Sequence, residues 1–125
     1  MLYEEITDKI IKSFYKVYNT LGYGFLERVY QKALLIELQE IGLECKEEFP
    51  IDVYYGGQIV GNYRADIIVE NVVIIENKAS ETLVEENEFQ LINYLKATNI
   101  EIGLLLNFGK KPQFKRKIYT NDRKK

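Results

Sequence analysis

The fold of this chain is decided by Tyr63-Arg64-Ala65-Asp66-Ile67-Ile68-Val69 and by Ile74-Ile75-Glu76-Asn77-Lys78-Ala79, which follows it closely. Both stretches are rich in β-branched residues, and the residues between them are typical of a turn, so they predict two consecutive strands. Each strand carries an acidic residue inside its apolar run, where charge is rarely buried without a partner. What these charges do depends on how the strands pair.

Two pairing registers are open for this hairpin. A loop over residues 70–72 places Asp66 directly opposite Glu76 and leaves one face of the hairpin cleanly apolar. A two-residue turn at Glu70-Asn71 would instead place Asp66 opposite Ile75, on the wrong face. Because a slip of one residue moves every side chain of a strand to the other face, the hydrophobic pattern favours the first register.

In that register Asp66, Glu76 and Lys78 lie together, since strand residues two apart share a face. Two neighbouring carboxylates repel each other unless a cation or a proton lies between them. Mg²⁺ or Mn²⁺ is bound by such carboxylates together with water and substrate phosphate, and the lysine can offset negative charge or orient a water. This is equipment for metal-assisted phosphodiester hydrolysis. The alternative is a surface ion pair, but the apolar flanks indicate a central strand.

The rest of the chain predicts an α/β fold. Hydrophobic periodicity favours helices at 2–20, 25–41 and 83–98, and strands at 49–55, 58–69, 72–79, 102–108 and 114–119. Pro50 marks the first strand as an edge, and Thr82 with Glu85 forms a capping-box pattern before the third helix. The order ααβββαβ(β) predicts a mixed sheet flanked by helices.

The composition excludes several kinds of site. The 125 residues include no His and only Cys45, which rules out Ser-His-Asp triads, multi-Cys zinc sites and an internal disulfide. One free thiol and no signal peptide predict a cytoplasmic protein. No apolar run approaches the roughly 20 residues of a membrane helix, so no membrane partner is expected. Catalysis would depend on carboxylate, Lys, Tyr and amide groups with a hard metal.

Charge is distributed unevenly along the chain. Residues 110–125 hold eight basic residues and one acidic residue, a net charge of +7, whereas the rest of the chain carries −9. Such a basic end can bind the phosphates of a nucleic acid, or it can be a solvated, frayed terminus. The candidate phosphate-binding residues are Lys110, Lys111, Lys115, Arg116 and Lys117.

Two helical residues could join the charged cluster. Gln90 lies on the third helix, with Tyr94 one turn later on the same face, and its amide could hold the lysine, a water or a phosphate. It could equally be a solvated residue. Glu27 lies in the first turn of the second helix, where the ordinary use of a glutamate is to complement the helix dipole.

Five sequence blocks support a family resemblance. Gly24-Phe25-Leu26-Glu27-Arg28-Val29-Tyr30 has the G-x-x-E-x-x-Y signature of the GxxExxY proteins. The other blocks of that family match, in the same order, residues 64–66, 76–79, 90–97 and 103–109. The chain therefore resembles the GxxExxY family over nearly its whole length, and that family resembles the PD-(D/E)XK nuclease superfamily.

This resemblance implies a restriction-endonuclease-like core over residues 1–120, followed by a basic C-terminal tail at 121–125. It assigns metal coordination to Asp66 and Glu76, with the backbone carbonyl of Asn77 as a third ligand. The pattern departs from the superfamily in two places, since Ala65 replaces the name-giving proline and Asn77 stands where relatives often carry an apolar residue.

The same resemblance assigns the remaining roles. Lys78 would be the catalytic lysine, Glu27 the helix carboxylate that supports a metal or its waters, and Gln90 the supporting amide. The implied cofactor is Mg²⁺ or Mn²⁺, and the implied partner is nucleic acid, most simply DNA.

Three functions follow from the sequence. The first is a metal-dependent nuclease acting on DNA, in which a homodimer would align two basic tails and serve both strands. The second is a catalytically silent nuclease-fold module that binds nucleic acid or a protein partner. The third is an oligomeric scaffold, because aromatic residues are enriched at interfaces. Its surface would hold Tyr54, Tyr55, Tyr63 and Phe114.

Overall fold

Five strands form one mixed sheet in the computed structural model, which describes residues 3–124. The chain order is α1 (Glu4–Leu21), α2 (Glu27–Glu40), β1 (Cys45–Tyr55), β2 (Gln58–Val69), β3 (Val73–Lys78), α3 (Glu85–Lys96), β4 (Ile102–Phe108), β5 (Pro112–Ile118) and the 3₁₀ helix η1 (Asn121–Arg123). The strands lie side by side in chain order, and only β3 and β4 are parallel because α3 crosses over between them. The predicted α/β fold and element order are confirmed.

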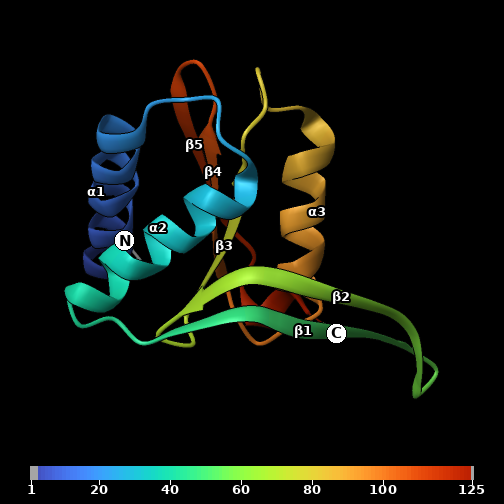
Figure 1. Ribbon diagram of the computed structural model, residues 1–125. Coiled ribbons are helices and arrows are strands. Elements are labelled where there is room, and N and C mark those ends of the chain that lie inside the picture. The colour runs from blue at the N-terminus through green and yellow to red at the C-terminus, as the bar shows by residue number, and fades with distance from the viewer. Residues whose placement is uncertain (1–2, 125) are drawn as a thin grey trace.

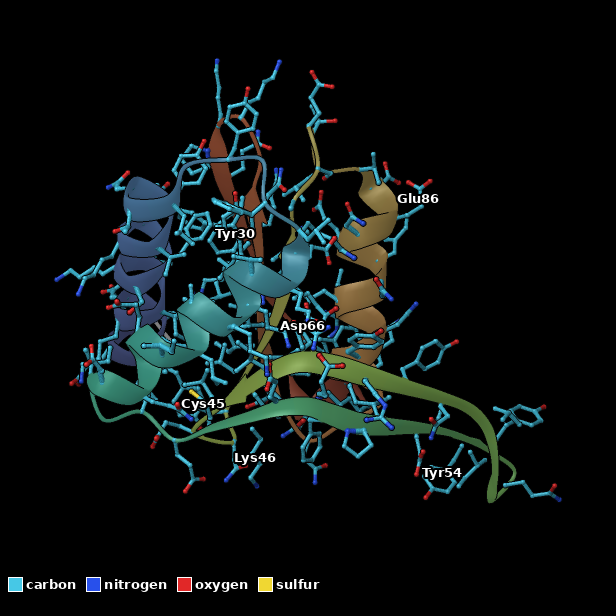
Figure 2. All side chains as sticks on the ribbon, viewed as in Figure 1. Tyr30, Cys45, Lys46, Tyr54, Asp66 and Glu86 are labelled. Atoms are coloured by element: carbon cyan, nitrogen blue, oxygen red, sulfur yellow. The ribbon has the colours of Figure 1, made fainter. Side chains whose placement is uncertain are left out.

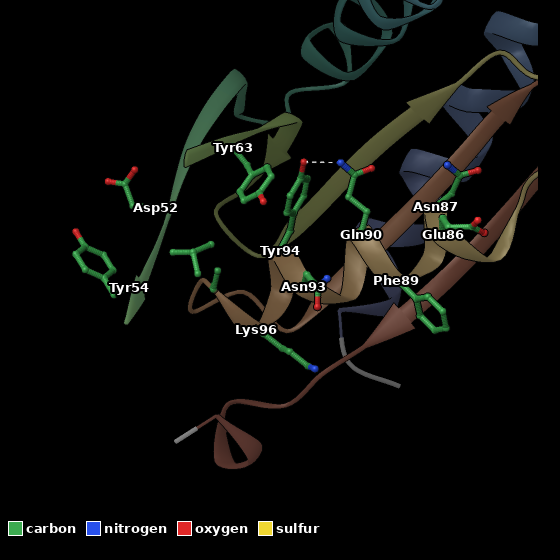
Figure 3. Close-up of a pocket in the computed structure, with 12 residues that line it drawn as sticks. Asp52, Tyr54, Tyr63, Glu86, Asn87, Phe89, Gln90, Asn93, Tyr94 and Lys96 are labelled. Atoms are coloured by element: carbon green, nitrogen blue, oxygen red, sulfur yellow. Dashed lines mark hydrogen bonds between the residues drawn. The ribbon is translucent and has the colours of Figure 1, made fainter. Parts of the chain in front are cut away.

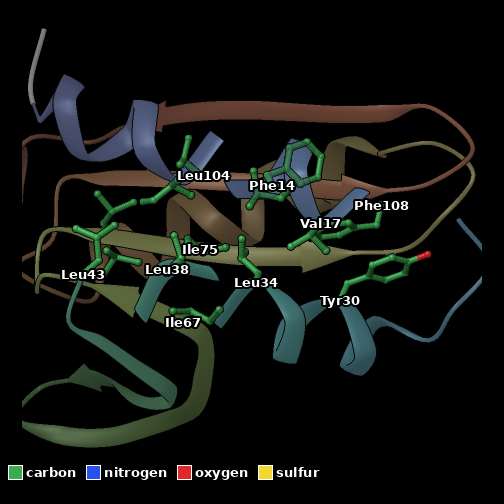
Figure 4. Packing of buried hydrophobic residues seen from close by; sticks show 14 of the residues in the cluster. Phe14, Val17, Tyr30, Leu34, Leu38, Leu43, Ile67, Ile75, Leu104 and Phe108 are labelled. Carbon is green, nitrogen blue, oxygen red and sulfur yellow. The ribbon is translucent and has the colours of Figure 1, made fainter. Parts of the chain in front are cut away.

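The sheet separates two apolar layers (Figure 1). On one face, α1 and α2 pack against β2, β3 and β4 through a cluster that includes Phe14, Tyr30 and Phe108 (Figure 4). On the other face, α3 packs through a second cluster around Leu91. Gly103 permits this contact, since a Cβ there would lie 2.6 Å from a methyl carbon of Leu91.

β2 takes part in both the central sheet and a long hairpin with β1. It pairs with β3 only from Ile67 to Val69, whereas it pairs with β1 along its whole length. The part of β2 before Asp66, together with the part of β1 that pairs with it, therefore projects from the rest of the sheet as an arm (Figure 1). The arm ends in Gly56-Gly57, where both residues have positive φ, as the predicted hairpin turn requires.

Two local predictions are wrong. β1 begins at Cys45 rather than residue 49, because pairing with β2 extends it past the polar residues that interrupt its pattern. α3 begins at Glu85, and the Thr82 capping box does not form. Asn87 accepts a hydrogen bond from the Val84 backbone N–H at 3.1 Å and closes the helix start instead. Thr82 lies in the preceding loop, where its carbonyl accepts a hydrogen bond from Ser80.

Some expected features lie beyond the described part of the chain. These are the first predicted helical residue, at position 2, and the last residue of the basic tail, at position 125. Within residues 3–124, no helix is both long and apolar enough to cross a lipid bilayer.

Candidate metal centre

Asp66 and Glu76 meet where β2 and β3 separate. The last pair of the ladder is Ile67 with Ile75, so the predicted register is confirmed. The next backbone groups bond to carboxylates instead of to each other. The Asp66 N–H donates to Oε2 of Glu76 at 2.9 Å, and the Asn77 N–H donates to Oδ2 of Asp66 at 2.7 Å. This reciprocal pair of hydrogen bonds holds the carboxylates of Asp66 and Glu76 at the point where β2 and β3 separate, which we call the fork. Figure 2 shows Asp66 on β2 between α2 and α3.

Burial raises the pKa of both carboxyl groups. The Glu76 side chain belongs to a residue only 5% exposed, and burial, followed by the charge of Asp66, raises its pKa to about 8. Burial also raises the pKa of Asp66 to about 6, against the Asn77 N–H, which favours the ionised form. Lys78 lowers both pKa values through its charge. The fork is therefore a place where negative charge lacks compensation and a cation would supply it.

The backbone of Asn77 faces the same gap. A strand residue directs its N–H and its C=O to one edge, and the Asn77 N–H points toward Asp66, so the carbonyl also faces the side from which β2 has departed. Its side chain is 1% exposed, and neither its amide nitrogen nor its amide oxygen has a hydrogen-bond partner. The Asn77 carbonyl is thus positioned to bind a ligand between the strands. The fold does not explain why the Asn77 amide is buried without a hydrogen-bond partner.

These donors suit one class of metal. Among residues 3–124, no three acidic or cysteine side chains converge closely enough to hold a metal by themselves. Two carboxylates and one carbonyl leave several positions for water or phosphate, which Mg²⁺ and Mn²⁺ accept readily. A hard divalent cation therefore fits the donor set.

Lys78 lies two residues beyond Glu76 on the same strand, beside Asn107 of β4. It is partly exposed. Within the described chain, no carboxylate lies within 4.0 Å of its ammonium, and no hydrogen bond engages it. Its charge acts on both carboxylates, and its three donors are available to a ligand.

Glu27 reaches the fork from the other side. It is the first residue of α2 and lines a small cleft of ≈ 430 Å³ that also includes Asp66 and Glu48. Its charge contributes to the raised pKa of Asp66. Glu27 therefore lies in the cleft beside the carboxylate pair, on the side of Asp66 and not of the deeper Glu76.

Tyr30, the last residue of the G-x-x-E-x-x-Y stretch, explains the position of Glu27. Its hydroxyl donates to the Gly22 carbonyl at 2.6 Å and accepts from the Phe25 N–H at 3.3 Å. Its ring stacks on Phe108 with centroids 4.5 Å apart. The tyrosine thus fixes the loop before α2, and with it the start of the helix that presents Glu27.

Sequence reasoning missed Glu48. Its φ of 52° is unusual for a residue with a side chain, and it lies across from Asp66 in the β1–β2 pairing. Its Oε2 accepts a hydrogen bond from Gln31 at 2.8 Å, and its charge raises the pKa of both Asp66 and Glu76. Nothing in the local sequence marks this position, because no glycine or turn pattern accompanies it.

Gln90 is hydrogen-bonded to Tyr94 on α3. Its amide donates to the Tyr94 hydroxyl at 2.9 Å, one helical turn away (Figure 3). Burial, followed by the charge of Glu76, raises the pKa of Tyr94, so the phenol lies within the field of the carboxylate pair. The predicted pair on α3 is therefore adjacent to the fork.

The basic residues of the sequence do not cluster at the fork. Lys110 and Lys111 are exposed in the turn between β4 and β5, and the other three lie on β5, the edge strand farthest from β1. Lys117 forms an ion pair with Glu88 of α3. Described residues of the tail pack onto the fold, since Lys124 donates to the carbonyls of Thr98 and Ile100.

A family model of the PD-(D/E)XK nuclease superfamily matches residues 4–117, which includes every element from α1 to β5 except the last residue of β5. The chain belongs to this superfamily. No curated protein matches the chain. Among solved structures, the crystal structure of SSO0001 is similar, with a TM-score of 0.60 and 22% sequence identity over 75% of this chain and 50% of that one. This PD-(D/E)XK chain thus spans half the length of that structure, and the likeness concerns the fold.

Proposed function

We propose that the protein is a metal-dependent nuclease that hydrolyses phosphodiester bonds of DNA. The observation that supports this most is the fork, where the buried carboxylate of Glu76 and the partly buried carboxylate of Asp66 both have raised pKa values. Lys78 lies beside them with no ion-pair partner among the described residues. A stable fold gains nothing from this arrangement, since buried charges of one sign destabilise it. Perturbed carboxylates are typical of functional sites.

The carboxylates of Asp66 and Glu76 and the carbonyl of Asn77 would hold Mg²⁺ or Mn²⁺. When bound, the cation would neutralise charge on the phosphate and lower the pKa of an attached water. Glu27 would bind water attached to the cation from the α2 side, because it faces the Asp66 edge of the fork.

The Lys78 ammonium would offset the negative charge that develops on the phosphoryl oxygens, or would orient the attacking water. Gln90 would keep the Tyr94 hydroxyl directed along α3 through their hydrogen bond. In this proposal Lys78 contacts the reacting group, whereas Gln90 is a positioning residue.

Cleavage of labelled single-stranded, duplex and branched DNA with Mn²⁺ tests the proposal. Asp66→Ala and Lys78→Ala should each lower the cleavage rate by roughly a thousandfold. Asp8→Ala and Lys12→Ala remove the same residue types from the exposed face of α1 and should leave the rate unchanged. Circular dichroism would confirm that all four variants fold.

Cleavage that persists in both Asp66→Ala and Lys78→Ala would contradict the proposal. Tight binding of DNA without divalent cations, and without cleavage of any form, would favour the silent nuclease-fold module instead.

Membership of the GxxExxY family within the superfamily is part of the same proposal. It is supported by residues 24–30, in which Glu27 faces the fork and Tyr30 holds the preceding loop. A homodimer would bring two forks to the two strands of a duplex, and the basic residues of 110–117 would contact its phosphates. Sedimentation of the free protein and of its DNA complex would measure the number of copies present.

A further inference from the structure

An aromatic groove lies between the projecting arm and α3. Its volume is ≈ 880 Å³, and it is lined by Tyr54 and Tyr63 from the arm and by Phe89 and Tyr94 from the helix (Figure 3). Tyr54, Tyr63 and Phe89 are 62%, 48% and 55% exposed. Exposed aromatic rings gathered along one groove favour a flat ligand that can stack on them.

One end of the groove lies next to the candidate metal centre. Gln90 and Tyr94 line the groove, and the Tyr94 phenol lies within the field of Glu76 and Asp66. The ring of Tyr63 lies 5.8 Å from that of Tyr94, so the aromatic lining continues from the fork onto the arm. A chain bound at the fork could therefore pass directly into the groove.

The other end of the groove is basic. Lys96 and Ala97 line both the groove and a second cavity of ≈ 620 Å³, which also includes Arg123 and Lys124. Lys96 and Arg123 lie over the ring of Tyr119, at 5.4 and 4.3 Å from its centroid. In the described chain, no carboxylate lies within ion-pair distance of these three cations.

Three cations brought together repel one another, and the charge of Glu101 on Lys124 offsets only part of this repulsion. An anion between the cations would remove more of it. The basic cavity is thus complementary to phosphate, on a chain whose first 109 residues carry a net charge of −9. Gln90 and Ala97 lie about two turns apart on one face of α3, roughly 10 Å along its axis, and they line the two ends of the groove.

We infer that the groove and the basic cavity form a track for a single-stranded segment of the nucleic acid cut at the fork. This inference rests on the proposed nuclease function. The bases of the segment stack on Tyr63 and Phe89, and its phosphates are bound by Lys96 and Arg123. A duplex would not use the groove, because its base faces are already stacked and unavailable to aromatic side chains.

Fluorescence anisotropy with a labelled oligothymidylate and the matching duplex tests the track. The buffer contains EDTA, so that binding is measured without cleavage. The wild type should bind the single strand more tightly than the duplex. Tyr63→Ala and Phe89→Ala should each weaken single-strand binding by about tenfold, since each base–aromatic stack is lost. The two residues come from different elements, so misfolding of the arm alone would not explain both results.

Lys96→Ala and Arg123→Ala should each weaken binding and reduce the slope of log K against log salt by about 0.7, the value for one phosphate of a single strand. Tyr23→Ala and Lys12→Ala, which are exposed residues on other surfaces, should bind as the wild type does.

Asp66→Ala separates this inference from the proposed function, because it should bind the single strand as the wild type does while failing to cut it. If the groove variants bind and cut normally while Asp66→Ala is inactive, the nuclease stands and the track is wrong. Wild-type protein that does not bind the single strand, or binds the duplex equally well, would also overturn the track. A doubled mass that Tyr63→Ala returns to a monomer would assign the groove to a second copy of the chain.

Discussion

The parallel strands β3 and β4 are neighbours of nearly equal burial, yet their last residues differ in chemistry. In register, Glu76 lies beside Leu105, Asn77 beside Leu106 and Lys78 beside Asn107. On β4, the leucines are fully buried and the one polar residue is satisfied. Asn107 accepts from the Ser80 N–H at 3.0 Å and donates to the Ser80 carbonyl at 2.9 Å. β4 thus shows what this sheet needs in order to fold.

β3 carries polar and charged groups that do not help the sheet to fold. Burial raises the pKa of Glu76, the Asn77 amide has no partner, and the Lys78 ammonium has none in the described chain. The first two features lower stability relative to the β4 pattern, whereas the ammonium of the partly exposed Lys78 is reached by water. Their occurrence together at the point where β2 departs indicates that a ligand, and not packing, accounts for them.

The largest effect on the free energy of unfolding should come from placing an acidic residue on β4 or removing the one on β3. Leu105→Glu buries a carboxylate without a partner and removes a core side chain, so it should lower the free energy of unfolding by about 4 kcal/mol or more. Glu76→Gln removes a buried charge but keeps an acceptor for the Asp66 N–H, so it should stabilise the metal-free protein at pH 8. Urea denaturation measures both. A Glu76→Gln variant that is much less stable than the wild type would refute the distinction between the strands.

The stability of the metal-free protein should fall as pH rises. The pKa of Glu76 is about 8 in the folded protein against an ordinary value of 4.5, so the folded state binds more protons than the unfolded state between these values. The stabilisation is fully present below pH 4.5 and is lost as pH rises through 8. The loss should be on the order of 5 kcal/mol, since the two pKa values differ by about 3.5 and one pKa unit corresponds to about 1.4 kcal/mol. Denaturation across pH 5–9 in EDTA should show this decline, and Glu76→Gln should flatten it.

Asn107 and Lys78 lie side by side but should differ in their effect on stability. Asn107→Ala leaves two backbone groups of Ser80 without partners and should cost about 2 kcal/mol. Lys78→Ala should change the free energy of unfolding by less than about 0.5 kcal/mol, because it breaks no contact. Thermal unfolding compares them directly. Equal losses in the two variants would mean that Lys78 has a structural partner.

A smaller effect than that of Asn107→Ala is expected at Asn77. Asn77→Val replaces an unpartnered buried amide with an apolar group and should stabilise the protein by about 1 kcal/mol. Cleavage should persist, because the proposed ligand is the backbone carbonyl, which valine retains. Loss of cleavage in a folded Asn77→Val variant would show instead that the side chain participates.

The register of the β2–β3 hairpin was predictable because its two faces differ so strongly. Only one alignment places Ile67 opposite Ile75 and Val69 opposite Val73 on one apolar face, and that alignment places Asp66 opposite Glu76. The same pattern was weak before residue 49, where Glu47 and Glu48 interrupt the apolar run, so the start of β1 was missed. The Thr82 capping box was wrong because the helix begins at Glu85, two residues later than predicted, with Asn87 as the side-chain acceptor.

Other parts of the site depend on contacts between distant segments. The role of Tyr30 requires its stacking on Phe108, and the basic cavity requires Lys96 and Arg123 to meet at Tyr119. The bonding of Asp66 and Glu76 to each other's strand requires β2 to be separated from β3 at every residue before Ile67. No local sequence pattern predicts these contacts, since they depend on how the helices and the arm pack against the sheet.

Calorimetric titration of Mn²⁺ into the wild type and into Asp66→Ala, at pH 7 in two buffers with different ionisation enthalpies, tests the central claim most directly. The wild type should bind the cation and release about one proton, because Glu76 is protonated in the metal-free protein. Asp66→Ala should not bind it. Equal binding by the two proteins would contradict the assignment of the fork as a metal site. So would an absence of binding to the wild type both alone and with a short DNA present.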